Sequence, residues 1–446
     1  MRWFVAGLAV VLACVGCGGD AASPSDAGID AGGGRDAGAD AGSDAGPPRV
    51  EWPNAESRAT SDPWIVDHHD EIQVMRPRVL GLNFVNARSN DDMRALFATI
   101  MGDIREGTRT HGYDAPDAPP FLEYELAYAV DLRDTTPTPV GYPYRNSTLY
   151  PREEPVDGYW GFDYERLFTP ELAALYGIEN PDAPGTYLTL CELSERGLVH
   201  EVWIYGDADV PDVGAAEILG IMPPHDATGH RVGVRMDRCA GNGCFDAEDT
   251  IPPECTRTLR VGWVNNTRGP GCFLESISHG YEAIGNGGLV PYLARYWHEF
   301  AGFDLDVRYG LPFDSWYGLC GGAGCLSYPT DHSVTYTNGT LSGTIDPYVP
   351  VCGNAHFPPN ARDGYDIVNT APVMSTCAGY RTAGGPSGGD PAAPLGANDW
   401  ARYRPMAGDC TGAWLVYWWQ SFPGLGSAAR DDAGGPMKNW WPFYFY

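Results

Sequence analysis

The chain is poor in positive charge. Of its 446 residues, 29 are Lys or Arg against 58 Asp or Glu, and the formal net charge is -29 at pH 7. Lys438 is the only lysine. A nucleic-acid binder needs a basic face for phosphate, and docking on anionic lipid through side chains needs a basic patch. The composition therefore argues against both kinds of partner.

Several enzyme signatures are also missing. The chain has no His-Glu-x-x-His sequence, no Walker loop and no Gly-x-Gly-x-x-Gly after a strand pattern. These absences disfavour a protease of the His-Glu-x-x-His type and a nucleotide enzyme, so we expect no nucleotide partner. Beyond the N-terminal segment, no apolar run has the length of a membrane span.

The N-terminus has the pattern of an export signal. An apolar run from Trp3 to Val15 follows a positive start and is too short for a permanent membrane helix. It ends in a small residue before Cys17, which resembles the lipobox of bacterial lipoproteins. We expect a signal peptide over 1–16, lipidation of Cys17 and export to the outer membrane, with the lipid as the only membrane contact. Cys14 is the rival anchor, and a plain secretory signal is the alternative.

Residues 17–48 are low in complexity, because Asp-Ala-Gly recurs five times between Asp26 and Gly46. Such a segment has too little apolar surface to offset the entropy of ordering the chain. We therefore expect a flexible tether over 17–48. The hydrophobic residues, 43% of the whole chain, are enough for a single large domain over 49–446.

Ten of the twelve cysteines follow the tether, and an even number in an exported chain indicates disulfides. The absence of Cys-x-x-Cys among these ten disfavours a zinc–thiolate site. Two pairs of cysteines each flank a glycine-rich turn that could bring them together, and a third candidate pair lies in the sequence between these two pairs. Pairs among Cys352, Cys377 and Cys410 are plausible too, and the connectivity stays open. The disulfide candidates are Cys239 with Cys244, Cys320 with Cys325, and Cys255 with Cys272.

Strand and helix patterns alternate from residue 78 to residue 303. Period-2 or continuous apolar runs predict strands, and apolar residues three or four apart predict helices. The predicted fold is α/β, an open and largely parallel sheet flanked by helices, with a loop-rich, disulfide-tied C-terminal third. The strands are expected at Arg78–Val85, Glu123–Leu132, Val199–Tyr205 and Leu259–Val264, and the main helices at Asp91–Ile104, Cys272–Ile284, Val290–Phe303 and Thr411–Phe422. Asn338-Gly339, within Val334–Ile345, is a hairpin signal.

The most informative stretch for chemistry runs from Val264 to Glu282, a strand, a Gly/Pro turn and a helix. Glu275, His279 and Glu282 are spaced i, i+4 and i+7, so they share one helix face. Two carboxylates beside an imidazole suit one divalent cation or a histidine general base. The same spacing also fits the solvated face of any amphipathic helix.

The turn before this helix lies where ligands bind in open α/β sheets, beyond the carboxyl ends of the strands. Free N–H groups at the helix start can bind an anion, and Arg268 and Asn265 are expected beside it as substrate-binding residues.

A second cluster lies in the rigid Pro/Gly loop that begins at Cys352. His356 and Asp366 are candidate catalytic residues, and Asn360 is a candidate substrate-binding residue. If this loop meets the helix, His279, Glu275 and His356 form a candidate metal set. A shared site requires His279 and His356 to lie within about 12 Å of each other. The alternative is an ordered loop that satisfies only its own backbone.

From about Arg78 to Tyr446 the chain resembles a family of uncharacterised exported bacterial proteins. The matching segments are Phe162–Arg166, Val199–Gly206, 265–282, Cys352–Asn360 and Asn439–Trp441. The family pattern Asn-Tyr-Glu-Arg-Gly leads into a helix bearing Glu, His and Glu, and is followed by a His-Phe-Pro-Pro-Asn loop. Asn265, Arg268, Gly269, Glu275, His279, Glu282, His356 and Asn360 occupy the matching positions, whereas Thr267 replaces the Glu. The resemblance supports the site and implies no particular substrate.

Three functions fit these observations. The first is a hydrolase of an extracellular polymer, glycan or peptide, with catalytic residues Glu275, His279, Glu282, His356 and Asp366 around at most one divalent cation. A glycosidase variant would use two carboxylates alone, about 5–10 Å apart. The second is a non-catalytic binder of glycan or protein that uses the aromatic residues Trp316, Tyr317, Trp400 and Tyr403. The third is a structural surface protein.

Overall fold

The structure is a computed structural model. It describes residues 49–57, 63–133, 160–161, 164–206, 213–214, 218–220, 224–233, 252, 255–320, 324–339, 341–385 and 388–446, with backbone alone at 160–161, 164–165, 213–214, 218–220 and 320. The predicted signal peptide, Cys17, the tether and the Cys239–Cys244 pair lie outside these residues and stay predictions. Residues 49–446 form one compact unit.

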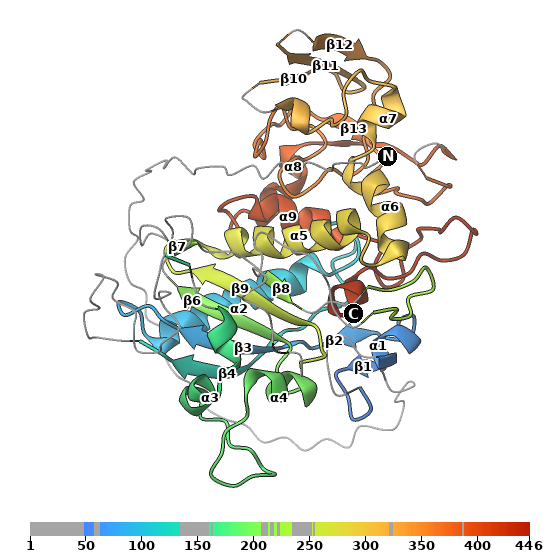
Figure 1. Cartoon of the computed structure of the whole chain (residues 1–446). Helices are drawn as coiled ribbons and strands as arrows, with labels where there is room; N and C mark the ends of the chain where they lie inside the picture. The colour runs from blue at the N-terminus through green and yellow to red at the C-terminus, as the bar shows by residue number, and fades with distance from the viewer. Residues whose placement is uncertain are drawn as a thin grey trace, which may run out of the picture. The chain divides into compact units, whose positions relative to one another are not determined.

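A five-stranded sheet lies at the centre of this unit (Figure 1). Its spatial order is β4 (Glu125–Asp131), β3 (Arg78–Asn83), β6 (Glu201–Gly206), β9 (Leu259–Asn265) and β8 (Ile218–Gly220). The first four strands are parallel, and β8 pairs antiparallel with β9 at one edge. The predicted open, largely parallel sheet is confirmed.

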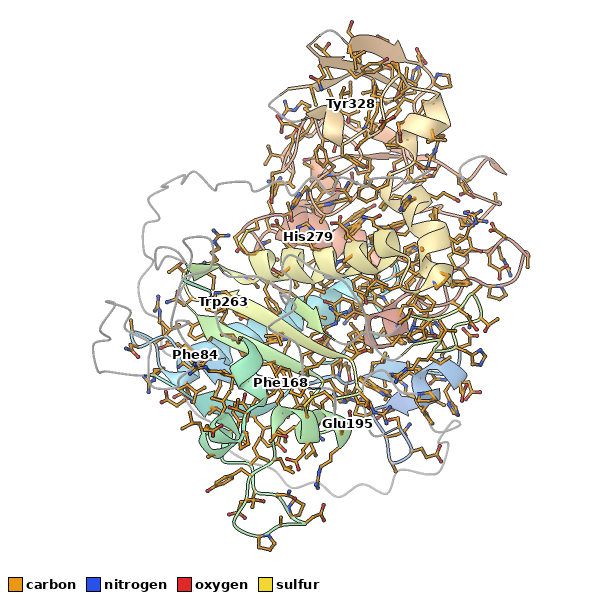
Figure 2. All side chains as sticks on the ribbon, viewed as in Figure 1. Phe84, Phe168, Glu195, Trp263, His279 and Tyr328 are labelled. Atoms are coloured by element: carbon orange, nitrogen blue, oxygen red, sulfur yellow. A yellow bond between two sulfur atoms is a disulfide. The ribbon has the colours of Figure 1, made fainter. Side chains whose placement is uncertain are left out.

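Helices cover both faces of the sheet, because strand side chains alternate between its two sides. On β6, Trp203 and Tyr205 belong to one core with α2 (Asn90–Gly107) and α5 (Pro270–Gly287), while Val202 and Ile204 belong to a second core. The second core includes side chains of α3 (Pro170–Tyr176) and α4 (Leu190–Glu195) and the labelled Phe84, Phe168 and Trp263 (Figure 2). The sheet is therefore buried on both sides, as parallel sheets generally are.

The C-terminal third adds a helical layer and a separate hairpin sheet. Helix α9 (Gly412–Gln420) packs on α2 and α5, and α6 (Pro291–Ala301) packs on α5. The hairpin predicted at Asn338-Gly339 is present, joining β11 (Ser333–Asn338) to β12 (Leu341–Ile345) in an antiparallel sheet with β10 (Leu326–Thr330). The shorter elements are β1 (Glu51–Trp52), α1 (Pro63–Asp67), β2 (Val74–Met75), β5 (Trp160–Gly161), β7 (Val213–Gly214), α7 (Leu305–Tyr309), β13 (Val373–Ser375), β14 (Ala393–Leu395) and α8 (Ala397–Trp400).

The aromatic C-terminal segment packs into the core. Trp440 and Trp441 are buried, and Tyr444 stacks on Tyr281 of α5 with ring centroids 4.4 Å apart. This segment therefore fixes the buried side of α5, opposite the side that carries the predicted site residues. No helix in the described part of the chain combines the length and apolar character needed to cross a membrane.

Three described disulfides tie the unit together, Cys191–Cys255, Cys272–Cys410 and Cys352–Cys377. The expected pairing of Cys255 with Cys272 is wrong, because these residues lie at opposite ends of β9 and each has a nearer partner from another element. Cys352–Cys377 is one of the pairs left open by the sequence. Cys325 is in a disulfide, and the side chain of Cys320 lies outside the described set, so their pairing stays a prediction.

Candidate metal centre

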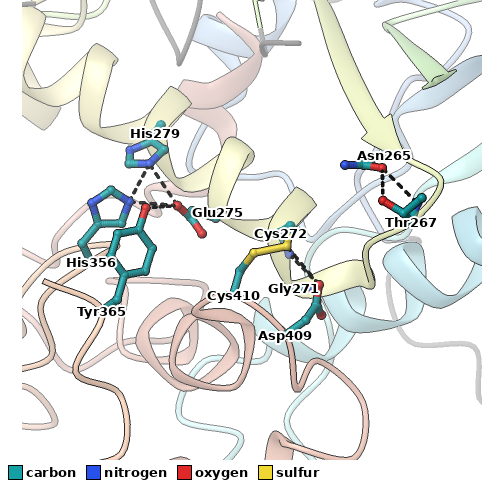
Figure 3. The surroundings of a disulfide bond; sticks show 10 residues. All are labelled: Asn265, Thr267, Gly271, Cys272, Glu275, His279, His356, Tyr365, Asp409 and Cys410. Carbon is teal, nitrogen blue, oxygen red and sulfur yellow. Dashed lines mark hydrogen bonds and ion pairs between the residues drawn. A yellow bond between two sulfur atoms is a disulfide. The ribbon is translucent and has the colours of Figure 1, made fainter. Parts of the chain in front are cut away.

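Helix α5 presents Glu275 and His279 on its polar side. The helix begins with Pro270 in its first turn, where the missing N–H is not needed, and ends at Gly288 in the left-handed conformation. Its apolar residues Phe273, Ile277, Tyr281 and Ile284 are buried in the core. Because that face is fixed by packing, the i, i+4 pair Glu275 and His279 is held facing the C-terminal loops (Figure 3).

The loop after Cys352 brings His356 to the same place. The disulfide to Cys377 anchors its start, and Gly353 adopts a positive φ of 71°, where a Cβ would collide with the Phe357 carbonyl oxygen. The Asn354 side-chain oxygen then accepts hydrogen bonds from the backbone N–H groups of His356 and Phe357, both at 3.1 Å. This local turn gives the His356 ring a fixed direction.

The two stretches converge, as the sequence predicted (Figure 3). The ring centroids of His279 and His356 lie 4.7 Å apart, and their Nε2 atoms lie 3.1 Å apart. The Glu275 Oε1 atom is 2.9 Å from His356 Nε2 and 3.8 Å from His279 Nε2. Two imidazole nitrogens and one carboxylate oxygen therefore form a small triangle. These three atoms lie close enough together to hold a metal ion.

The size of the triangle matches a tetrahedral cation. Its three corners lie on a circle of radius about 1.9 Å, and three ligands at the zinc distances of about 2.0–2.1 Å in ideal tetrahedral geometry define nearly the same circle. A zinc-sized ion would sit just outside the plane of the three atoms. Glu275, His279 and His356 thus supply three ligands of the chemical type that zinc prefers.

A single proton does not join all three atoms of the triangle. If His279 Nε2 donates to His356 Nε2, the latter faces the Glu275 oxygen at 2.9 Å without a hydrogen between them. If His356 Nε2 carries the proton instead, that single hydrogen can point well at only one of its two neighbours. A cation bound to all three atoms removes the conflict.

Glu282 supports the site from behind and does not line it. Its Oε2 atom is 2.7 Å from His279 Nδ1, and its Oε1 atom accepts the Ala355 N–H at 3.1 Å. A carboxylate on the far ring nitrogen is the usual partner of a metal-bound histidine, because it fixes the tautomer and the ring orientation. Glu282 also links helix α5 to the loop that carries His356.

The electrostatics keep both carboxylates ionised. Burial alone would lower the pKa of His279, but Glu282 and Glu275 raise it to about 10. Burial would raise the pKa of Glu275, but the nearby His279 and the hydrogen bonds from His356 and Tyr365 lower it to about 2. Without a cation, His279 therefore carries a positive charge that offsets one of the two carboxylate charges.

Tyr365 is part of the site and was not predicted from the sequence. Its hydroxyl donates to Glu275 Oε1 at 2.8 Å, and its ring stacks on His356 with centroids 4.2 Å apart. About half of its surface is exposed. The sequence offered little signal, since a tyrosine nine residues after His356 is meaningful only once the loop folds back on itself.

Asp366 and Asn360 shape the loop and do not reach the site. Asp366 accepts from the Arg362 side chain at 2.6 and 3.0 Å, so its charge is compensated locally. Asn360 is fully buried and donates to the Asn369 and Ala371 carbonyl oxygens at 2.7 and 2.8 Å. The expected catalytic role of Asp366 and the expected substrate contact of Asn360 are not supported by these positions.

Asn265 and Arg268 belong to the turn before α5 and stay outside the triangle. The Asn265 side-chain oxygen accepts from the N–H and hydroxyl of Thr267, both at 2.9 Å, and Arg268 is exposed (Figure 3). The helix start expected to bind an anion is already capped. Asp409 accepts the Gly271 N–H at 2.9 Å and the Cys272 N–H at 3.4 Å.

The aromatic residues suggested for a glycan- or protein-binding surface lie mostly inside the protein. Trp316, Trp400 and Tyr403 are 2%, 0% and 4% exposed, and Tyr317 is half-buried with its hydroxyl donating to the Ala301 carbonyl oxygen. These residues stabilise cores, and they do not form the exposed patch that such a binder would need.

Comparisons with known proteins add no family. No family model, no curated protein and no solved structure matches the chain. The resemblance to exported bacterial proteins therefore stays a prediction, and the function rests on the geometry of the site.

Proposed function

We propose that Glu275, His279 and His356 bind one divalent cation of the zinc type, and that the protein is a cation-dependent hydrolase of an extracellular polymer. The observation that carries the proposal is the triangle of two imidazole nitrogens and one carboxylate oxygen with sides of 3.1, 2.9 and 3.8 Å. Its dimensions fit a tetrahedral ion, and a single proton does not join all three atoms.

Three protein ligands favour catalysis over a structural role. Structural zinc sites have four protein ligands, whereas catalytic sites have three and keep one position for water or substrate. Within the described residues, no fourth His, Cys, Asp or Glu joins this group. His356 and Tyr365 are partly exposed, so the side of the triangle near them is accessible from solvent. A bound cation there would polarise a substrate or activate water.

The predicted location of the protein suggests what kind of substrate it meets. A lipid on Cys17 and a tether over 17–48 would hold the domain outside the outer membrane, where it meets polymers such as glycans and peptides. The net charge of -29 disfavours polyanionic substrates, because like charges repel on approach. The alternative, a non-catalytic surface binder, is disfavoured because the aromatic residues suggested for its binding surface are mostly buried.

The test is metal analysis of the full chain purified in detergent and incubated with zinc. We expect one zinc ion per chain in the wild type and none in His279→Ala. The matched control is His298→Ala, which removes an exposed histidine of α6. A screen of peptide and glycan hydrolysis follows, with His279→Ala as the inactive reference. Equal zinc content in wild type and His279→Ala would refute the site, and activity retained in the variant would refute the mechanism.

A further inference from the structure

We propose that the Tyr365 hydroxyl is the protein's own contact to the substrate, and that the substrate is recognised by a carbonyl oxygen held between this hydroxyl and the cation. The bond to be cleaved is then an acyl or peptide bond, not a glycosidic one. This inference rests on the proposed cation site and specifies its substrate class.

The backbone at Tyr365 is held in an unfavourable conformation. Its φ is +65°, a region that non-glycine residues rarely adopt. The surrounding loop fixes this conformation through a hydrogen bond from the Tyr365 N–H to the His356 carbonyl oxygen at 2.9 Å. Strain of this kind persists only where neighbouring contacts impose it, and it concentrates at functional sites.

Two side-chain pairs hold the loop on either side of Tyr365. Asn360 and Asn369 donate to each other's carbonyl oxygens, both at 2.7 Å, and Arg362 and Asp366 form a two-pronged ion pair across the turn. These contacts flank Tyr365 on both sides in the sequence. The polar side chains of this loop therefore bind one another, and the exposed Tyr365 lies between them in the sequence, beside the triangle.

The position of the hydroxyl suits a substrate contact. It lies 2.8 Å from Glu275 Oε1, one of the three atoms that would bind the cation. Cation binding would draw electron density from that oxygen and weaken it as an acceptor, so the hydroxyl could turn its proton toward another acceptor at the same edge. A carbonyl oxygen bound at the fourth position of the cation is such an acceptor, and it gains negative charge during acyl transfer.

The carboxylates of the site exclude the glycosidic alternative. Glycoside hydrolysis uses two carboxylates flanking the bond. Of the predicted carboxylates, only Glu275 lines the triangle, since Glu282 lies behind His279 and Asp366 is paired with Arg362. One carboxylate that is itself a ligand does not supply both an acid and a base.

A phosphoryl substrate is disfavoured because the loop beside the site has few basic residues. Such substrates are bound by several Arg or Lys side chains or by a pair of cations. On the loop from Cys352 to Asn369, all of which is described, Arg362 is the single basic residue other than His356, and its charge is compensated by Asp366. A neutral carbonyl fits this environment better.

The test uses acetohydroxamate, a small ligand that carries a carbonyl oxygen, and azide, which needs only the cation. Both are titrated into the full chain loaded with Co²⁺, whose visible spectrum reports ligands entering its coordination sphere. The variants are Tyr365→Phe, which keeps the ring stacked on His356, and Tyr187→Phe as a matched exposed tyrosine.

We expect Tyr365→Phe to bind Co²⁺ and azide within about threefold of wild type and acetohydroxamate about tenfold more weakly, because one hydrogen bond is lost. Tyr187→Phe should match wild type for all three. Equal acetohydroxamate affinity in Tyr365→Phe and wild type would overturn this inference alone. Loss of Co²⁺ binding in Tyr365→Phe would also overturn it, since the hydroxyl would then serve only to hold Glu275. Failure of the wild type to bind Co²⁺ would overturn the proposed function itself.

Discussion

Removal of His356 provides the sharpest test of the cation site. The His356 Nε2 atom is the corner of the triangle that makes both short contacts, 3.1 Å to His279 and 2.9 Å to Glu275. In His356→Ala the cation would keep only the two ligands on α5, spaced i and i+4. We therefore expect zinc affinity to fall by at least about 100-fold, which corresponds to about 2.7 kcal/mol.

The geometry also predicts an order among variants. Glu282 contacts His279 Nδ1 and would not touch the cation, so Glu282→Gln should lower zinc affinity by only about tenfold, the lower end for such supporting partners. His298→Ala should leave the affinity unchanged, because His298 is exposed on α6. The three variants form a series in which the loss follows the distance of the side chain from the triangle.

The assay is competition between the protein and a chromophoric zinc chelator, with circular dichroism to confirm that each variant folds. The proposed site is refuted if His356→Ala binds zinc within threefold of the wild type. The site is also refuted if Glu282→Gln loses more zinc affinity than His356→Ala, because the Glu282 carboxylate would then bind the cation and the His356 imidazole would only support it.

Three further predictions concern stability. In the folded, cation-free protein the pKa of His279 is raised from 6.5 to about 10. Protonated His279 therefore contributes to the free energy of unfolding, fully below about pH 6.5 and progressively less as the pH rises through about 10. In denaturant titrations, His279→Gln should show a smaller decline of stability over this pH range. Burial and the charge of Asp409 raise the pKa of Asp103 from 3.8 to about 7, so its contribution is complete below about pH 4 and lost by about pH 7. Asp103→Asn should consequently stabilise the protein by on the order of 1–3 kcal/mol at pH 8 relative to its effect at pH 4; an identical effect at the two pH values would contradict this. Replacing Cys352 and Cys377 by Ser opens a loop of sequence separation 25 and should cost about 3.5 kcal/mol in the unfolding free energy, and zinc affinity should fall as well because His356 loses its anchor; unchanged denaturation midpoints would contradict the stabilising role.

The sequence predicted the parts of the fold that depend on local periodicity. The mostly apolar run Val199–Tyr205 and the helical spacing after Cys272 were enough to place β6 and α5, because a strand covered on both faces is buried along its length and a helix buries one face. The shared face of Glu275 and His279 followed directly from helix geometry. The hairpin at Asn338-Gly339 was likewise a local signal.

Features that depend on tertiary contacts were predicted less well. Cys255 and Cys272 looked like partners because they are near in sequence, but β9 runs between them and separates them. Asp366 carries the right chemistry for a site, yet its partner is decided by the turn that brings Arg362 within reach. Tyr365 was missed because its direction depends on a positive φ that no spacing rule indicates.

The Asp409 cap on α5 has a consequence for how the molecule matures. The helix that carries Glu275 and His279 has its first N–H groups satisfied by a side chain 138 residues further along the chain, next to the Cys272–Cys410 disulfide. A polypeptide cut short after α6 would contain both helical ligands but neither His356 nor this cap. The proposed cation site is therefore complete only once nearly the whole chain has been made and folded, and prematurely terminated products would lack it.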